Sequence, residues 1–326
     1  MRPMKELAQT LRLTRFPARW DALAERLGEA DSTFLSEAWI RGCAFPLGDE
    51  LADVLAGAAA VRENPPLRDY TVLLAAAMRD RAQFVSELRE IVFPVPAPGE
   101  DALGYDLAPC LALLTQGEAS IGRMRARAVP EDVIAATLDN TRECLRVFKA
   151  RWGRPGYDMH YFGWSQGFLD GRILQIGSLQ FEAAPRFGRS LVLPDRTIGP
   201  DDPVIHVHIP EGADISHEGR HAAYGRARRV FEKSFPEMSF RGFACHSWLM
   251  DPNLARLLPG SRIAAFQGEF IRLPERDGGG AVYEYVFIGD EPTPRGMSER
   301  TRLQRTLKKW YLEGHTIDEM RGFMPF

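Results

Sequence analysis

The stretch from Phe243 to Pro252 reads FACHSWLMDP, an apolar run that leads into three reactive side chains and then an Asp-Pro pair. The apolar run is typical of a buried strand. The Asp-Pro pair is typical of a helix start, with Asp251 as N-cap and Pro252 in the first turn. Reactive groups at the carboxyl end of a strand are where α/β folds usually carry their sites. The stretch therefore predicts a strand, a short helix and a candidate site at their junction.

The composition is that of an ordinary globular protein. The chain has 326 residues and a mass of 36.6 kDa, with 45% hydrophobic and 26% charged residues, so it is long enough to form two cores. Its 41 basic and 44 acidic side chains leave a formal charge of -3, which provides no field to gather nucleic acid or anionic lipid. The cysteines, which lack paired spacing, are Cys43, Cys110, Cys144 and Cys245. We expect reduced thiols in a cytoplasmic protein with neither a signal peptide nor a membrane span.

Residues 1–150 carry apolar side chains at helical spacing, as at Leu51, Val54 and Ala58. Proline-containing breaks divide this half into roughly six helices. The segment 129–132 (VPED) is typical of a helix start, because proline and acids favour the first turn. We therefore expect a helical domain here.

Residues 151–326 change to glycine, aromatic residues and short β-rich runs. Strands are expected at 172–182, with 188–193 as its hairpin partner, and at 203–209, 240–246, 261–273 and 281–288. Helices are expected at 216–235, 251–258 and 300–313, the last of which closes the chain. The fold class is thus α+β, a helical domain followed by a mixed-sheet domain.

Five segments of the chain also resemble a known family. They are LQIGSLQFE (174–182), HIPEG (208–212), CHSWLMDPNLARLLP (245–259), FQGEF (266–270) and TRLQRTLKKWYLEG (301–314). In the acyltransferase-domain family of bacterial proteins that they resemble, a helical N-acyltransferase N-terminal domain precedes a GNAT-like C-terminal domain. The resemblance implies domains at 1–150 and 151–326, and transfer of an acyl group from acyl-CoA or an acyl carrier to an amine.

The resemblance also implies where the donor binds. The pantetheine would lie between strands 203–209 and 240–246, with the pyrophosphate at the start of the intervening helix. The cofactor-binding residues so implied are Ile209, Gly212 and Ser216. The basic, glycine-rich phosphate loop of the general fold is missing, however, and segment 210–219 carries the acids Glu211, Asp214 and Glu218. These acids argue against coenzyme A binding in the standard manner, because they repel a pyrophosphate.

Two histidines on the first of these strands are candidates for acid–base chemistry. His206 and His208 are two residues apart, so their side chains share one face. His208 is the candidate general base, because an imidazole titrates near working pH, and His206 is a candidate substrate contact. Glu211, where the strand ends, could act through a water. The alternative is a pair of hydrogen-bonded histidines on a sheet face.

The reactive triplet Cys245, His246 and Ser247 cannot enter one pocket as a whole, because neighbours on a strand point to opposite faces. Either Cys245 and Ser247 face the pocket or His246 does so alone. A nucleophilic Cys-His pair would have to join Cys245 to His206 or His208. The alternative for Cys245 is a small core residue.

The segment His217 to His221 (HEGRH) matches the H-E-x-x-H zinc pattern. Gly219 and Arg220 depart from zinc-peptidase helices, and Glu237 is the possible third ligand by spacing. We expect no metal here and no convergence of the two imidazoles with a third ligand.

The remaining candidates are substrate contacts: Trp164 in the aromatic run 152–168, Gln180 and Trp248. Core packing is the alternative for the aromatic residues. Together the candidates favour direct attack of an amine on a thioester. The rival functions are a zinc hydrolase, a Cys-dependent transferase or hydrolase, and a non-catalytic binding module on the same fold.

Overall fold

The computed structural model describes residues 2, 4–13, 32–79, 88, 92–157 and 159–326. The chain divides into two compact units, Met1–Arg125 with Ala135–Gly171, and Ala126–Ile134 with Arg172–Phe326. The second unit thus resumes after Gly171, whereas the change in composition predicts a domain boundary at residue 150. The limits 1–150 and 151–326 stay predictions.

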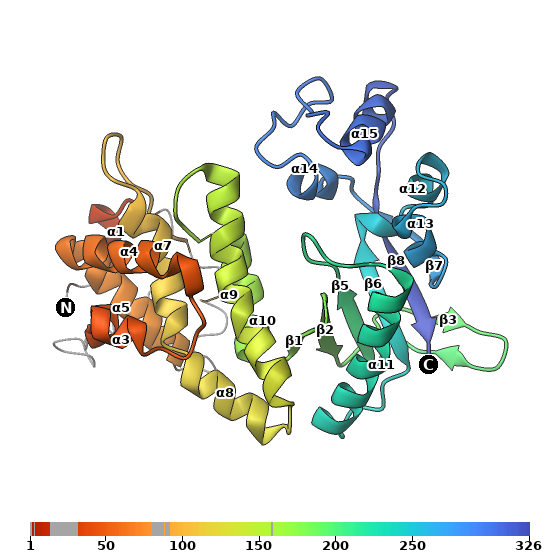
Figure 1. The fold of residues 1–326 in the computed structure, drawn as a ribbon, viewed down its shortest axis with the longest axis horizontal. Coiled ribbons are helices and arrows are strands. Elements are labelled where there is room, and N and C mark those ends of the chain that lie inside the picture. The colour runs from red at the N-terminus through yellow and green to blue at the C-terminus, as the bar shows by residue number, and fades with distance from the viewer. Residues whose placement is uncertain (1, 3, 14–31, 80–87, 89–91, 158) are drawn as a thin grey trace. The chain divides into compact units, whose positions relative to one another are not determined.

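The first unit is helical, as the apolar spacing predicts (Figure 1). Its helices are α1 (Met4–Thr10), α3 (Glu37–Arg41), α4 (Leu51–Glu63), α5 (Pro65–Arg79), α7 (Leu103–Leu114), α8 (Gly117–Ala126), α9 (Glu131–Trp152) and α10 (Met159–Leu169), with 3-10 turns at Thr33–Leu35 and Gly48–Glu50. Helix α9 begins directly after Pro130, which confirms the predicted start. Among the described helices of both units, none is long and apolar enough to cross a membrane.

The core of the first unit forms where α4 packs against α7. Val54 and Ala58, two of the periodic positions on α4, are fully buried. Gly57 lies against α7, where a β-carbon would come within 2.4 Å of Cδ1 of Leu107. Only glycine therefore allows the two helices to approach so closely.

The second unit is built on a mixed six-stranded sheet in the order β1-β2-β5-β6-β8-β7. Its strands are β1 (Ile173–Ile176), β2 (Leu179–Ala184), β5 (Val204–His208), β6 (Gly242–Ser247), β7 (Ile271–Asp277) and β8 (Glu319–Pro325). All neighbours are antiparallel except β5 and β6, which are parallel. A separate two-stranded ribbon pairs β3 (Leu191–Val192) with β4 (Thr197–Ile198).

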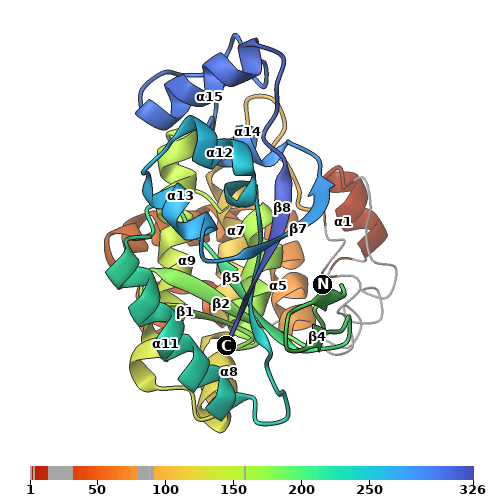
Figure 2. The same ribbon diagram turned by 90° about the vertical axis from the view of Figure 1, so that its right-hand side faces the viewer.

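The predicted strand, helix, strand unit is confirmed. Helix α11 (His217–Ser234) connects β5 to its parallel neighbour β6 and crosses the sheet in Figure 2. Tyr224 of α11 packs its ring against Phe181 of β2 and Phe243 of β6, with ring centroids 6.3 and 5.1 Å apart. These contacts define the covered face of the sheet, the one against α11.

The prediction of one strand over 172–182 was wrong. The segment is a hairpin, in which Ile176 pairs with Leu179 across a two-residue turn. Gly177 has φ 61, and a Gly-Ser pair with glycine first suits the II′ turns that match strand twist. Apolar and polar residues alternate on both sides of the turn, so the pattern alone is that of one continuous strand. Residues 188–193 accordingly pair with β4 instead of serving as the partner of this segment.

The predicted strand pair 261–273 and 281–288 was also wrong. Helix α13 (Arg262–Gln267) begins after Ser261, whose hydroxyl accepts from the amide of Ala264 at 3.1 Å. Residues 281–285 form helix α14 (Ala281–Tyr285), and β7 pairs instead with β8. Helix α15 (Arg302–Leu312) does not close the chain, because β8 follows it. Strand pairing between segments so far apart in sequence leaves no local signal.

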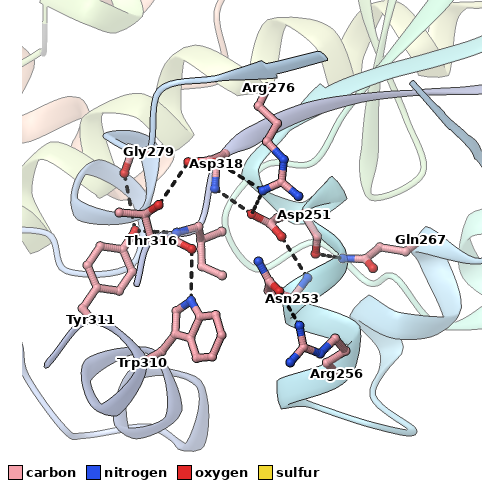
Figure 3. A network of polar contacts seen from close by, with 11 residues as sticks. Asp251, Asn253, Arg256, Gln267, Arg276, Gly279, Trp310, Tyr311, Thr316 and Asp318 are labelled. Atoms are coloured by element: carbon pink, nitrogen blue, oxygen red, sulfur yellow. Dashed lines mark hydrogen bonds and ion pairs between the residues drawn. The ribbon is translucent and has the colours of Figure 1, made fainter. Parts of the chain in front are cut away.

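Asp251 belongs to a network of polar contacts, which Figure 3 shows. Asp251 is fully buried and caps α12 (Pro252–Leu257) by accepting from the amide of Asn253 at 2.8 Å. Its second oxygen accepts from the amide of Asp318, at the start of β8, also at 2.8 Å. The Gln267 amide donates to the Asp251 carbonyl at 2.8 Å. One carboxylate therefore ties α12 to the residue that precedes β8.

Candidate active site

An opening between β5 and β6 is the main feature of the second unit. The two strands pair at Ile205–Phe243 and at His206–Ala244, and the described register contains no further pair toward their carboxyl ends. Strand β5 continues against β2 as far as His208, while β6 continues against β8 as far as Ser247. The pairing of the two parallel strands therefore ends at Ala244, and we call the unpaired stretch between their carboxyl ends the opening.

The sheet face opposite α11 carries a row of polar side chains beside this opening. Register pairs place Gln180 and Glu182 of β2 next to His208 and His206, and Arg321 of β8 next to His246. We call this set the histidine face; its members are Gln180, Glu182, His206, His208, His246, Asp277 and Arg321. Sequence spacing predicts that His206 and His208 share a face, and their stacked rings, with centroids 6.1 Å apart, confirm it.

His208 is held by an acid from the neighbouring strand. Its Nε2 atom lies 3.0 Å from Oε2 of Glu182, whose carboxylate also forms an ion pair with Arg172. Burial lowers the pKa of His208 to about 4, and the Arg172 guanidinium acts in the same direction. The ring is therefore neutral at pH 7 and able to accept a proton.

His206 lies near two other imidazoles and one guanidinium, whose protonated forms would repel a charge on its ring. Burial, followed by the charges of His208, His246 and Arg321, lowers the pKa of His206 to about 4. His246 in turn contacts Asp277, with 2.9 Å between Nε2 and Oδ2, and Arg321 reaches the same oxygen at 2.7 Å. The three histidines thus occupy one face, and the two on β5 are partly buried and neutral at pH 7.

Cys245 does not join them. Ala244 is the register partner of His206, so Cys245, the next residue, points to the covered face under α11. Its side chain is fully buried, and burial raises its pKa to about 12. A pairing of Cys245 with His206 or His208 is excluded by this geometry, because the groups lie on opposite faces. Of the two arrangements open from the sequence, His246 alone turns toward the histidines.

The other candidates near the opening have structural contacts. Ser247 accepts from the amide of Leu249 at 3.1 Å and caps the 3-10 turn Trp248–Met250. Trp248 and Ile209 are partly buried against an apolar cluster around Leu249, Leu254 and Leu307. Their predicted roles in binding remain predictions.

The loop between β5 and α11 ends in a cap. Gly212 has φ 75, and Glu211 is exposed. Ser216 accepts from the amide of Gly219 at 3.2 Å. Asp214 accepts from both the amide and the hydroxyl of Ser216 at 2.9 Å. A carboxylate thus occupies the start of the helix, the position that the resemblance implies for a pyrophosphate.

Two predicted substrate contacts differ in their setting. Gln180 is buried on β2, opposite His208 in the register, and belongs to the histidine face. Trp164 lies on α10 in the first unit, where its ring packs edge to face with Phe168 at 6.2 Å. Its role in binding remains a prediction.

The H-E-x-x-H segment contacts Glu269, a residue that sequence spacing does not suggest. His217 and His221 stack with centroids 4.2 Å apart, and Nε2 of His221 lies 2.7 Å from Oε1 of Glu269. Glu269 comes from the FQGEF segment, and Arg220 binds both of its carboxylate oxygens. The structure therefore brings in Glu269, where sequence spacing suggests Glu237.

Sequence reasoning missed the three charged partners of the histidines on this face, Glu182, Asp277 and Arg321. Glu182 could have been found from the sequence, because the alternating pattern of LQFE (179–182) places it on the same strand face as Gln180, a predicted substrate contact. No local sequence pattern identifies Asp277 or Arg321 as site residues, because β7 and β8 come together only in the folded chain. Tertiary pairing alone brings them to the site.

Family models match both halves of the chain. Residues 48–171 match the N-acyltransferase N-terminal domain, and residues 173–324 match the GNAT-like C-terminal domain. The chain belongs to this two-domain N-acyltransferase family. The predicted family and fold class are thus confirmed. No curated protein matches the chain significantly in sequence.

Several solved acyltransferase structures share the fold. An acyltransferase in complex with decanoyl-CoA and teicoplanin is 21% identical over 99% of both chains, with a TM-score of 0.77. An acyltransferase variant in complex with octanoyl-CoA is 20% identical over 99% of both chains, also with a TM-score of 0.77. An acyltransferase with decanoyl-CoA alone is 22% identical over the whole of both chains, with a TM-score of 0.73. At these identities the similarity establishes the fold alone.

Proposed function

We propose that the chain transfers an acyl group from an acyl-CoA thioester to an amine by direct attack, in the cytoplasm. The observation that carries the proposal is the opening between β5 and β6 with neutral histidines beside it. Membership of the N-acyltransferase family supports the reaction class. The acyl-CoA complexes of proteins with this fold support the class of donor. The cysteines, all free thiols, fit a reducing compartment.

The proposed reaction assigns His208 as the base. The amine nitrogen attacks the thioester carbonyl carbon, a C–N bond forms, and the C–S bond breaks. His208 takes the proton lost by nitrogen and then gives it to the departing thiolate, which leaves as the thiol and returns His208 to its neutral form. Glu182 fixes the His208 ring and favours the imidazolium that forms. Backbone amides bordering the opening are the candidate donors to the carbonyl oxygen.

The mechanism needs no covalent enzyme intermediate. Cys245 is a poor nucleophile because its thiol is buried and stays protonated at pH 7. It also faces α11, away from the proposed base. His246 is held by Asp277 on the same face as His208 and is assigned to binding the acceptor or the leaving group.

The test is amine-dependent release of thiol. Purified protein would be mixed with octanoyl-CoA or decanoyl-CoA and a panel of primary amines, with thiol release followed by a chromogenic reagent. The same acyl groups on an acyl carrier protein would compare the two classes of donor. We expect thiol release only when an amine is present, with a matching amide product detected by mass spectrometry.

Two results would overturn the proposal. Thiol release at the same rate without amine would indicate a hydrolase. Saturable binding of acyl-CoA without turnover for any amine or donor would indicate a binding module.

A further inference from the structure

We propose that His217, His221 and Glu269 form a binding site for one borderline divalent cation such as Zn²⁺, joining the start of α11 to the turn after α13. This reverses the expectation drawn from the sequence and goes beyond the acyl transfer proposed above. The cation is assigned no step in that reaction.

Geometry is the first support. One nitrogen from each imidazole and one oxygen of Glu269 all lie within 4.8 Å of one another. Among the described residues, no other group of three histidine, cysteine, aspartate or glutamate side chains lies this close together. Zinc ligands lie about 2.0–2.2 Å from the metal, so a modest rotation of exposed His217 would close the set. The two imidazoles are one helical turn apart, the spacing that suits a shared cation.

The carboxylate is already positioned. Arg220 is almost fully buried and binds Glu269 through Nε at 2.9 and 2.8 Å and through Nη2 at 2.6 Å. Arg220 also donates to the carbonyl of Ile215 at 2.9 Å, which holds the guanidinium in place. Carboxylate ligands of metals are commonly oriented by such outer hydrogen bonds. The Glu269 oxygen that now contacts His221 would contact the cation instead.

A buried polar atom without a partner lies next to this group. The Tyr224 hydroxyl has no hydrogen-bond partner among the described residues, and its ring packs against His221 with centroids 5.8 Å apart. A water bound to the cation would offer this hydroxyl a partner.

The ligand set selects the class of cation. Two imidazoles and one carboxylate suit Zn²⁺, Co²⁺ or Ni²⁺, whereas Mg²⁺ and Ca²⁺ prefer oxygen ligands alone. With three protein ligands, one position stays open to water. Since binding to the folded state alone stabilises it, the cation should raise the melting temperature.

The test uses the full chain without a polyhistidine tag, stripped with a chelator and titrated with Zn²⁺ by calorimetry. We expect one equivalent to bind, Co²⁺ to give a visible absorption band, and Zn²⁺ to raise the melting temperature. His217→Gln and His221→Gln should each weaken binding at least about tenfold. Glu269→Gln should weaken it similarly while the amide oxygen keeps a partner for Arg220. The matched control is His315→Gln, because His315 is exposed and stacks on Trp310, away from the three ligands.

The proposal fails if Zn²⁺ binds equally well to the His217→Gln, His221→Gln double variant. It also fails if the stripped protein binds no Zn²⁺, or if His315→Gln removes binding as strongly. Acyl transfer by the stripped protein would leave the proposed function standing in each case, so the two proposals fail separately.

Discussion

At the scale of single residues, the face of the sheet on which a side chain lies decides its chemistry. His208 and Cys245 both lie in motifs that resemble the acyltransferase family, yet they lie on opposite faces of the sheet. His208 is neutral and held by Glu182, whereas Cys245 is a buried thiol under α11. A one-residue shift along β6 would bring Cys245 to the histidine face and turn His246 under α11.

The effects of substitution should follow this difference. His208→Ala should lower turnover in the amine-dependent assay by about 100-fold or more, the usual contribution of a general base. Cys245→Ala, which adds no polar atom to the core, should retain most of the activity. Glu211→Ala should be intermediate if it acts through a water. An inactive Cys245→Ala with an active His208→Ala, both folded by circular dichroism, would instead favour a covalent mechanism.

At the scale of elements, two acids fix the ends of helices in the second unit. Asp251 caps α12 and accepts from the backbone amide of Asp318, just before β8. Asp214 accepts from the amide and the hydroxyl of Ser216, the residue that caps α11. Asp251 lies in a family-like motif next to the reactive triplet, yet its contacts are structural. The motif therefore includes a residue that joins α12 to the start of β8, in addition to its candidate site residues.

Asp251→Ala should destabilise the fold. The change removes an N-cap, worth about 1 kcal/mol, and leaves a buried amide of Asp318 without its acceptor, worth about 1–3 kcal/mol. We expect the free energy of unfolding in urea to fall by about 2–4 kcal/mol. Asp201→Ala is the control, because that side chain is 83% exposed, and its effect should stay within about 0.5 kcal/mol. An equal effect for both would contradict the role of Asp251.

Asp214 gives a test of how the donor is bound. If the pyrophosphate approaches the start of α11, Asp214→Asn should lower the KM for octanoyl-CoA by about two- to fivefold. Removing a charge near a helix end is worth up to about 1 kcal/mol. Octanoyl-pantetheine, which has no phosphate, is the control donor and should show no such change. Equal shifts for both donors would place the phosphates elsewhere.

At the scale of the whole molecule, the chain is not divided at a single point. Segment 126–134 belongs to the second unit although helices of the first unit flank it. Asp132 forms an ion pair with Arg226 of α11, and Arg127 lies over the ring of Phe235 at 4.5 Å. Helix α9 therefore begins in one unit and continues in the other.

The buried histidines should make global stability depend on pH. The pKa of His206 is about 4 in the folded state and about 6.5 when unfolded, so the unfolded chain binds more protons between these values. Its contribution to stability is fully present above about pH 6.5 and is lost as the pH falls toward 4. Each unit of pKa corresponds to about 1.4 kcal/mol. We expect the melting temperature to fall over this range, and to fall less in His206→Gln. An unchanged pH profile in the variant would contradict this account.

The sequence by itself determined the fold class, the family, the β5, α11, β6 unit and the Asp251 cap. Each of these depends on local patterns: helical or alternating periodicity, capping residues and short motifs. It also placed His206 and His208 on one face, because strand geometry fixes the alternation of side chains.

Only the tertiary structure decided which other groups meet them. Strand β8 pairs with β6 and β7 across long stretches of chain and brings Arg321 and Asp277 to the histidine face. The fold likewise turned Cys245 away and placed Glu269 beside His221. Such contacts depend on which distant segments pack together, and they cannot be predicted from the sequence near each residue.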